Sequence, residues 1–326
     1  MGDGPDLGAL FGAGDVTTFL GLAGCADLGR LDASSAFLGA PAATPYGAVG
    51  AYAKGGPASL RKAAAALSAN LGRFNFDLGG PTFPEGTRPA VDCGDLDWSE
   101  TDFAANRAAI RETVARIVAA GTVPIVIGGD DSVPIPMIEA LDATGERYTI
   151  LQIDAHIDWR DSHMGERFGL SSTMRRASEM AHVECIVQVG ARGIGSAAPE
   201  DVQAALDWGA RLFPMREVAR HGLGPVLEAI PEGANLILCI DIDAMDPGLA
   251  PNTIGRAPGG LSYGQMLDLV EGAAARGRIA AVDVVEIMPE ADIGGIGAMT
   301  VSRLVAATMG HLARQDARLA LARGGS

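Results

Sequence analysis

Short runs of apolar residues alternate with amphipathic stretches along most of this chain of 326 residues. The runs are almost continuously apolar and rich in Val and Ile, which is typical of strands that are buried on both faces. They predict strands over residues 36–39, 123–128, 148–154, 183–190, 235–241 and 279–286. The stretches between them predict helices over residues 57–70, 101–121, 199–210 and 262–277. This alternation predicts an α/β fold with a mostly parallel sheet that helices cover on both faces.

The domain organisation follows from what interrupts this pattern. No repeat of fixed period and no low-complexity linker divides the chain, so we predict one domain over residues 1–326, with a flexible N-terminal stretch of about 15 residues. Residues 40–56 and 74–100 are rich in Gly, Pro and Asp, and we expect long ordered loops there.

Composition narrows the class of protein. The hydrophobic fraction of 48% excludes disorder as the main state, and the net charge of −15 argues against nucleic-acid or membrane-surface partners. The four cysteines are widely and irregularly spaced, so neither a disulfide framework nor a zinc motif is predicted. Without a basic, apolar leader or a run of about 18–20 apolar residues, we expect a cytoplasmic protein.

Acidic residues follow three of the predicted strands, at the ends where ligands bind in open α/β sheets. Gly129-Asp130-Asp131-Ser132 follows the strand at 123–128, and Asp154-Ala155-His156-Ile157-Asp158 follows the strand at 148–153. Asp241-Ile242-Asp243 ends the strand at 235–241. A spacing of two residues places side chains on one face of an extended segment, so these side chains can converge.

Converging carboxylates in a water-poor crevice repel one another, and a divalent cation removes that cost. Carboxylate oxygens together with an imidazole suit Mn²⁺ and also Ni²⁺. A single Asp-x-Asp is weak support, because Asp also caps helices and turns, but two such groups after buried strands are stronger. The pattern therefore predicts a divalent-metal site.

The chain resembles the ureohydrolases, the family of arginase, agmatinase and guanidinobutyrase. The resemblance runs from about Thr18 to the last predicted helix, and further short motifs occur in the order that the family has. These motifs are Gly56-Pro57-Ala58-Ser59-Leu60-Arg61, Asp92-Cys93-Gly94-Asp95, Gly165-Glu166-Arg167, Met174-Arg175-Arg176-Ala177, Pro258-Gly259-Gly260-Leu261-Ser262 and Asp283-Val284-Val285-Glu286.

The resemblance implies a three-layer α/β/α fold and a two-metal site, where a hydroxide held by the metals attacks the guanidinium carbon and urea leaves. It implies that Asp154 and Asp241 bridge a pair of Mn or Ni ions, that Asp158 completes one metal site, and that His156 and Asp243 complete the other. It also implies that Glu286 pairs with the guanidinium group of a small guanidino or amidine substrate. Family members form trimers and hexamers, so an oligomer is expected.

The chain departs from the family at several site positions. Asp131 stands where the family has His in Gly-Gly-Asp-His-Ser, which adds a negative charge and alters metal affinity. Leu170-Ser171 stands where agmatinases have His-Gly, and Leu cannot transfer a proton. His163, seven residues earlier, is a candidate replacement, although the pattern favours a surface loop histidine without a catalytic role. Ala43 and residues 254–256 also differ from the family pattern.

These departures leave two hypotheses open. The chain is an active metallohydrolase, or it is a degenerate structural or regulatory subunit that supports an active ureohydrolase paralogue, as in metformin hydrolase, a heteromeric member of the family. A third interpretation, a binding protein without metal, requires Lys or Arg to neutralise the acidic cluster. Arg160 and Arg256 are the basic residues in the neighbouring loops.

Overall fold

The computed structural model describes residues 16–195 and 197–324, and the N-terminal stretch that we predict to be flexible lies outside these residues. Within the described part, nine strands form one sheet in the order β1-β5-β2-β6-β11-β10-β7-β8-β9. The strands are β1 (Ala23–Gly24), β2 (Ser35–Ala40), β5 (Ala90–Asp95), β6 (Val123–Gly128), β7 (Tyr148–Ile153), β8 (Val183–Val189), β9 (Arg211–Phe213), β10 (Asn235–Asp241) and β11 (Arg278–Val285). Every neighbouring pair in this sheet is parallel.

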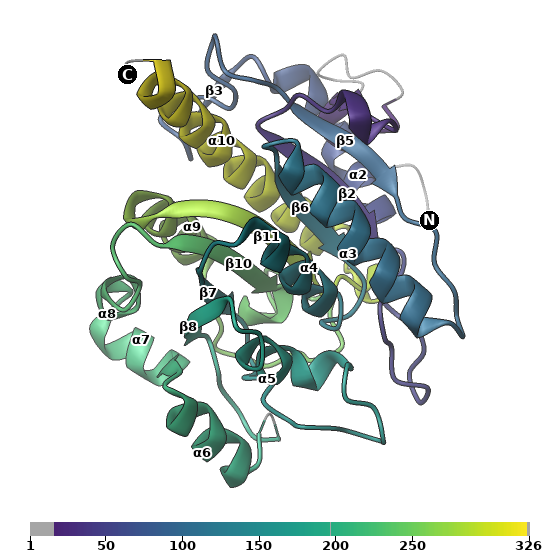
Figure 1. Ribbon diagram of the computed structural model, residues 1–326, viewed down its shortest axis with the longest axis vertical. Coiled ribbons are helices and arrows are strands. Elements are labelled where there is room, and N and C mark those ends of the chain that lie inside the picture. The colour runs from purple at the N-terminus through teal and green to yellow at the C-terminus, as the bar shows by residue number, and fades with distance from the viewer. Residues whose placement is uncertain (1–15, 196, 325–326) are drawn as a thin grey trace.

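Helices cover both faces of the sheet, which gives the expected three-layer α/β/α architecture (Figure 1). One layer contains α2 (Gly56–Ala65), α7 (Met215–His221), α8 (Gly224–Glu228), α9 (Tyr263–Arg276) and α10 (Ile296–Gly324). The other layer contains α3 (Phe103–Ala119), α4 (Pro134–Ala140), α5 (Thr173–Ser178) and α6 (Pro199–Trp208).

The central strands are apolar on both faces because each face packs against a helical layer. In β10, Leu238 and Ile240 belong to the core beneath α9 and α10, whereas Ile237 and Cys239 belong to the core beneath α3 and α4. All four side chains are at most 1% exposed. This two-sided burial explains why the strand reads as a continuous apolar run rather than an alternating one.

Helix α3 shows how local sequence sets the length of an element. The Asp102 carboxylate accepts a hydrogen bond from the Ala105 amide at 2.9 Å and caps the first turn. Ile110, Val114 and Ile117 recur at helical spacing and are buried against the sheet layer. Gly121, with φ of +70°, follows the helix where the chain must turn toward β6.

The six predicted strands are confirmed, but the expectation of a loop over all of residues 74–100 is wrong. Residues 90–95 form β5, and residues 74–81 form a small hairpin of β3 (Phe74–Asn75) and β4 (Gly80–Pro81). Strand β5 lies near the edge of the sheet and is buried only in its first half, so its sequence lacks an apolar run. The predicted helix at 57–70 ends at Ala65, and Ser68–Asn70 forms a separate 3₁₀ turn.

The arrangement of the strands positions the acidic residues. Strands β6, β11, β10 and β7 are consecutive neighbours, and their parallel direction brings their carboxyl ends to one edge of the sheet. Asp131, Glu286 and Asp154 follow the ends of β6, β11 and β7, and Asp241 is the last residue of β10. No helix within the described residues is long and apolar enough to cross a membrane.

Candidate metal centre

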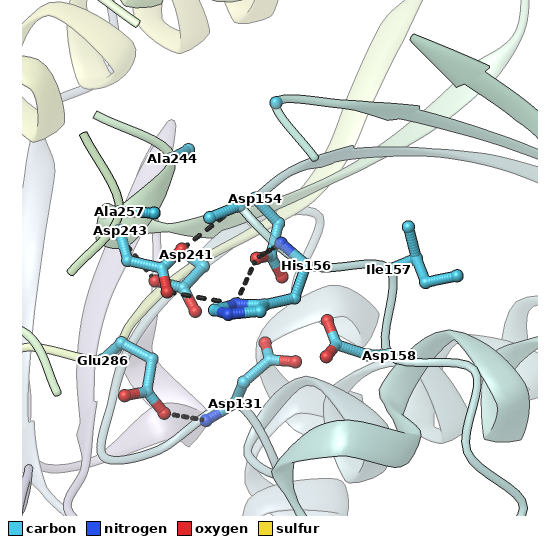
Figure 2. A network of polar contacts seen from close by, with 12 residues as sticks. Asp131, Asp154, His156, Ile157, Asp158, Asp241, Asp243, Ala244, Ala257 and Glu286 are labelled. Carbon is cyan, nitrogen blue, oxygen red and sulfur yellow. Dashed lines mark hydrogen bonds and ion pairs between the residues drawn. The ribbon is translucent and has the colours of Figure 1, made fainter. Parts of the chain in front are cut away.

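Six side chains at the sheet edge form two groups that share one carboxylate. Asp154, His156, Asp241 and Asp243 form the imidazole-containing group, in which one ligand atom of each residue lies within 4.8 Å of the others. Asp131, Asp154 and Asp158 form the all-carboxylate group by the same measure. Figure 2 shows the His156 ring beside Asp154 and Asp243, with the Asp131 and Asp158 carboxylates on the other side of the cluster.

Hydrogen bonds hold the imidazole-containing group together. The His156 Nδ1 atom lies 3.3 Å from Asp154 Oδ1 and 3.1 Å from Asp243 Oδ2. Burial lowers the pKa of His156, but these two carboxylates outweigh it and raise that pKa to about 12. The same histidine holds the pKa of Asp154 below its usual value despite the burial of that carboxyl group. This group therefore contains its own positive charge.

The all-carboxylate group has no such compensation. Burial raises the pKa of Asp131 well above its usual value, and the neighbouring Asp158 and Asp154 carboxylates raise it further. Burial and Asp154 do the same to the pKa of Asp158. Asp131 Oδ2 is buried and has no hydrogen-bond donor among the described residues.

This donor set fits a divalent cation. Carboxylate oxygens and one imidazole are ligands of first-row divalent metals, and an unpartnered buried oxygen is costly unless a cation or donor reaches it. Among the described residues, no Lys or Arg forms an ion pair with the clustered carboxylates, whose ion-pair partner is His156. The geometry thus disfavours the metal-free interpretation, which needs such a neutralising partner.

A chain of amides supports the cluster from inside the sheet. The Gln152 Nε2 atom donates to Asp154 Oδ2 and to Asp158 Oδ2, each at 2.7 Å. Gln188 Nε2 in turn donates to Gln152 Oε1, and Trp159 Nε1 donates to Gln188 Oε1 at 2.7 Å. Gln152 and Gln188 lie on neighbouring strands in register. Our sequence analysis missed Gln152, although a buried glutamine two residues before the first aspartate is a signal that could have indicated it.

Glu286 lies beside the cluster and is held by residues distant in sequence. The Tyr52 hydroxyl lies 2.7 Å from Oε1 and 2.8 Å from Oε2 of Glu286, and the Asp131 amide donates to Oε1 at 3.0 Å. Burial raises the pKa of Glu286 to about 8, with a further contribution from Asp130. Tyr52 is separated from Glu286 by 234 residues, and no motif indicated it.

Two of the predicted site residues adopt strained backbone conformations. Asp158 has φ of +51° and Glu286 has φ of +66°, a region that residues other than glycine rarely adopt. Such strain persists only where the surroundings impose it, and it concentrates at functional sites. At Gly255 an added Cβ would lie 2.6 Å from Asp243 Oδ2 and 2.9 Å from His156 Cε1, so a larger residue in this loop would displace these two side chains.

A cavity of about 260 Å³ opens onto the cluster. Glu286 and the clustered side chains other than Asp154 line it, and its wall also includes Tyr46, Arg160, His163 and Leu170. His163 precedes the tight turn at Met164-Gly165 and pairs with Glu166 across it. Arg160 Nη1 lies 3.1 Å from His163 Nδ1, so the nitrogen accepts the bond because a guanidinium can only donate.

The other departures from the family pattern lie around this cavity. Leu170 and Ile254 line it, and Ser171 is held by a 2.6 Å hydrogen bond to the Tyr46 hydroxyl. The Arg256 guanidinium instead donates to the backbone oxygens of Pro251 and Ala291. Ala43 is buried in the core beneath α3 and α4. Of the two loop arginines, Arg160 is therefore the one that lines the cavity.

Comparison with known proteins gives matches over most of the chain. The sequence model of the Arginase family matches residues 33–310. The mitochondrial agmatinase of Gallus gallus is 30% identical over 258 residues, which cover 78% of this chain and 74% of the relative. A guanidinobutyrase of Pseudomonas aeruginosa is 29% identical over 245 residues, which cover 74% of each protein. A crystal structure of a hypothetical agmatinase from Burkholderia thailandensis superposes with a TM-score of 0.79 at 24% identity and covers 93% of both chains.

Proposed function

The chain belongs to the arginase family, and on that basis we propose that it is a metal-dependent hydrolase that cleaves a guanidino compound and releases urea. The observation that carries this proposal is the convergence of the six predicted ligand side chains, Asp131 included, in one cluster, five of which line a cavity together with Glu286. A site that had lost its function would be free to lose this convergence, whereas here the replaced position still offers a buried oxygen to the cluster.

We assign the ligands as follows. Asp154 and Asp241 would hold a pair of divalent ions, with Asp131 and Asp158 completing one metal site and His156 and Asp243 completing the other. Mn²⁺ and Ni²⁺ are the ions that this oxygen-rich set with one imidazole suits. When bound, such a pair supplies Lewis-acid activation of water toward nucleophilic attack at neutral pH.

The residues of the chain bind and orient the substrate. The Glu286 carboxylate receives the guanidinium group, and the planar fork of that cation matches two carboxylate oxygens. The Tyr52 hydroxyl and the Asp131 amide fix the Glu286 side chain before substrate arrives. This preorganisation presents the guanidinium carbon to the cluster and lowers the entropic cost of reaching the reactive geometry.

Arg160 favours a substrate with an acidic tail. Its side chain makes no ion pair with another described residue, and its guanidinium donates to His163 and to the Gly195 backbone oxygen at 3.4 Å. The cavity thus has a carboxylate, Glu286, and a guanidinium, Arg160, in its wall. A linear ω-guanidino acid carries the complementary charges, whereas agmatine would place an ammonium group near Arg160. We therefore propose a guanidino acid as substrate.

His163 is the group that we propose for proton traffic at the leaving nitrogen, in place of the histidine that Leu170 replaces. Because Nδ1 accepts from Arg160, the remaining ring proton is on Nε2, which can donate a hydrogen bond. Complete transfer of that proton to the leaving nitrogen requires the Arg160 guanidinium to give up its hydrogen bond to His163 Nδ1. A change in the pH profile of activity in His163→Gln, without a change in metal content, would support this role.

The test is urea release by the purified chain with Mn²⁺ or Ni²⁺, comparing 4-guanidinobutyrate with agmatine. We expect 4-guanidinobutyrate to have the higher kcat/KM, and Arg160→Gln to lower it about tenfold to a hundredfold, as the loss of a charged hydrogen bond does. Agmatine turnover should not fall in this variant. Arg220→Gln on α7, whose ion pair with Glu217 is exposed, is the matched control.

The second candidate is a degenerate subunit that supports an active ureohydrolase paralogue in a heteromeric trimer or hexamer. The Asp131 and Leu170 replacements favour it, since both lie in the cavity wall. Assaying the chain first by itself and then with a co-encoded paralogue separates the two proposals. Urea release by the isolated chain excludes the subunit role. Urea release by the mixture but not by the isolated chain excludes independent activity.

A further inference from the structure

Two cysteines lie side by side at the edge of the sheet that β1 and β5 form, away from the candidate metal centre. Strands β1 and β5 pair in parallel, with Ala23 opposite Val91 and Gly24 opposite Asp92. The Cys25 amide donates to the Asp92 backbone oxygen at 2.8 Å and so continues this ladder by one residue. The register therefore places Cys25 next to Cys93.

The two thiols also lie on the same face of the sheet. Both side chains are half-buried and pack against the same core layer, the one beneath α3 and α4. The Cys25 thiol lies close enough to contribute, after burial, to the raised pKa of the Cys93 thiol. Neighbouring strands are about 4.7–4.9 Å apart, which lies within the Cα separation of about 4.4–6.8 Å that a disulfide spans.

We propose that Cys25 and Cys93 are a redox modification site that closes to an intrachain disulfide on exposure to a peroxide. The bond would tie the short edge strand β1 covalently to β5. The same strand pair is already linked to the rest of the fold through Asp92, which accepts hydrogen bonds from the Phe19 amide and from the Arg61 side chain. The disulfide would thus hold the segment around residues 19–25 on the sheet.

The reaction balances with hydrogen peroxide as the oxidant. The Cys25 thiol loses its proton to solvent and its thiolate attacks one peroxide oxygen; the O–O bond breaks, and a sulfenic acid and a hydroxide form, the hydroxide taking up the released proton to become water. The Cys93 sulfur then attacks the sulfenic sulfur, the S–O bond breaks, and a second water leaves as the S–S bond forms. Two thiols are oxidised and one peroxide is reduced to two waters.

The environment of the Cys93 thiol makes Cys93 the residue that attacks the sulfenic sulfur of Cys25 in the second step. Burial raises the pKa of the Cys93 thiol to about 12, which makes it a poor first nucleophile toward a peroxide in solution. Its contact with Cys25 makes the second step intramolecular, and proximity offsets a small thiolate fraction. Cys185 on β8 and the buried Cys239 on β10 lie on other strands and serve as internal references.

The experiment treats the full chain with a modest excess of hydrogen peroxide and then maps its tryptic peptides without reductant. Cys25 lies in the peptide that ends at Arg30, and Cys93 lies in the peptide from Phe74 to Arg107, because Arg88 precedes a proline. We expect these peptides to be linked with the loss of two hydrogens. Free thiols in the denatured chain should fall from four to the two of Cys185 and Cys239.

Variants make the assignment specific. The crosslink should persist in Cys185→Ser, vanish in Cys25→Ser and Cys93→Ser, and reverse with dithiothreitol. In Cys93→Ser, a dimedone adduct on Cys25 is expected, because the sulfenic acid has no partner thiol. Four remaining thiols after peroxide treatment, a crosslink that includes Cys185, or a disulfide between two chains would each overturn the proposal. None of these readouts depends on catalytic activity or metal content.

Discussion

The two groups of the candidate metal centre share Asp154 but differ in how their buried charge is compensated. In the imidazole-containing group, His156 bridges Asp154 and Asp243 and offsets their repulsion. In the all-carboxylate group, the Gln152 amide reaches Asp158 while Asp131 Oδ2 has no donor among the described residues. The first group can persist without a cation, whereas the second depends on one.

This difference shows which of the two groups is affected by having Asp131 where the family has histidine. An imidazole at position 131 would make the two groups alike, each with one neutral ligand. A carboxylate there concentrates negative charge on one side and raises the demand for a cation on that side. We therefore expect the two metal sites to differ in affinity, and the following experiments break or sharpen that contrast.

The largest effect is expected from Asp154→Asn, because both groups lose their shared carboxylate. Metal content should fall to background for both ions, and activity should fall by several orders of magnitude with it. Elemental analysis after gel filtration measures the content, and Asp97→Asn, at an exposed position, is the control. Metal content equal to that of the unaltered chain would contradict the ligand assignment.

Removing the amide support should have the next largest effect. Gln152→Leu deletes the donor to Asp154 and Asp158, and loss of such a partner costs about tenfold to a hundredfold in metal affinity. The loss should be greater for the all-carboxylate group, where Asp158 has this bond and no imidazole contact. Calorimetric titration of metal into the chelated protein resolves the two sites, with the exposed Gln203→Leu as control. Equal weakening of both sites would argue against the contrast.

A smaller gain is expected when position 131 is returned to histidine. Asp131→His exchanges a carboxylate for an imidazole, which Ni²⁺ prefers, so the site that contains position 131 should bind Ni²⁺ about tenfold more tightly, or by about 1.4 kcal/mol. Preference should also shift toward Ni²⁺ over Mn²⁺. Under the degenerate-subunit proposal, Asp131→His combined with Leu170→His should raise turnover as well. No gain in occupancy or turnover would weaken that proposal.

The smallest effect concerns the pH dependence of stability in the chelated protein. The pKa of Glu286 is raised from its usual 4.5 to about 8, so the folded chain binds that proton more tightly than the unfolded chain. Its stabilising contribution is present below about pH 4.5 and is lost as the pH rises through 8. Tm should fall by a few degrees between these values, and less in Glu286→Gln. A Tm that rises over this interval would show that other groups dominate.

Much of the fold could be predicted because strands buried on both faces carry a local signature. The apolar runs ending at Gly128, Ile153 and Asp241 form three of the central strands. Strands β1, β5 and β9 could not be predicted in the same way. They lie at or near the sheet edges and are short or only partly buried, so their residues carry little apolar pattern.

The same distinction holds within the site. Residues that follow a strand end at a spacing of two, such as Asp154 and His156, are visible in the chain itself because their geometry is local. Tyr52 meets Glu286 across 234 residues, and Gln152 meets Gln188 across 36, so only packing of the layers brings these side chains together. The sequence alone thus specified which residue types are available as ligands and in which order they follow one another, because their spacing after a strand end is a local property. Which distant side chains orient them, and which arginine lines the cavity, depended on long-range contacts that no short segment encodes.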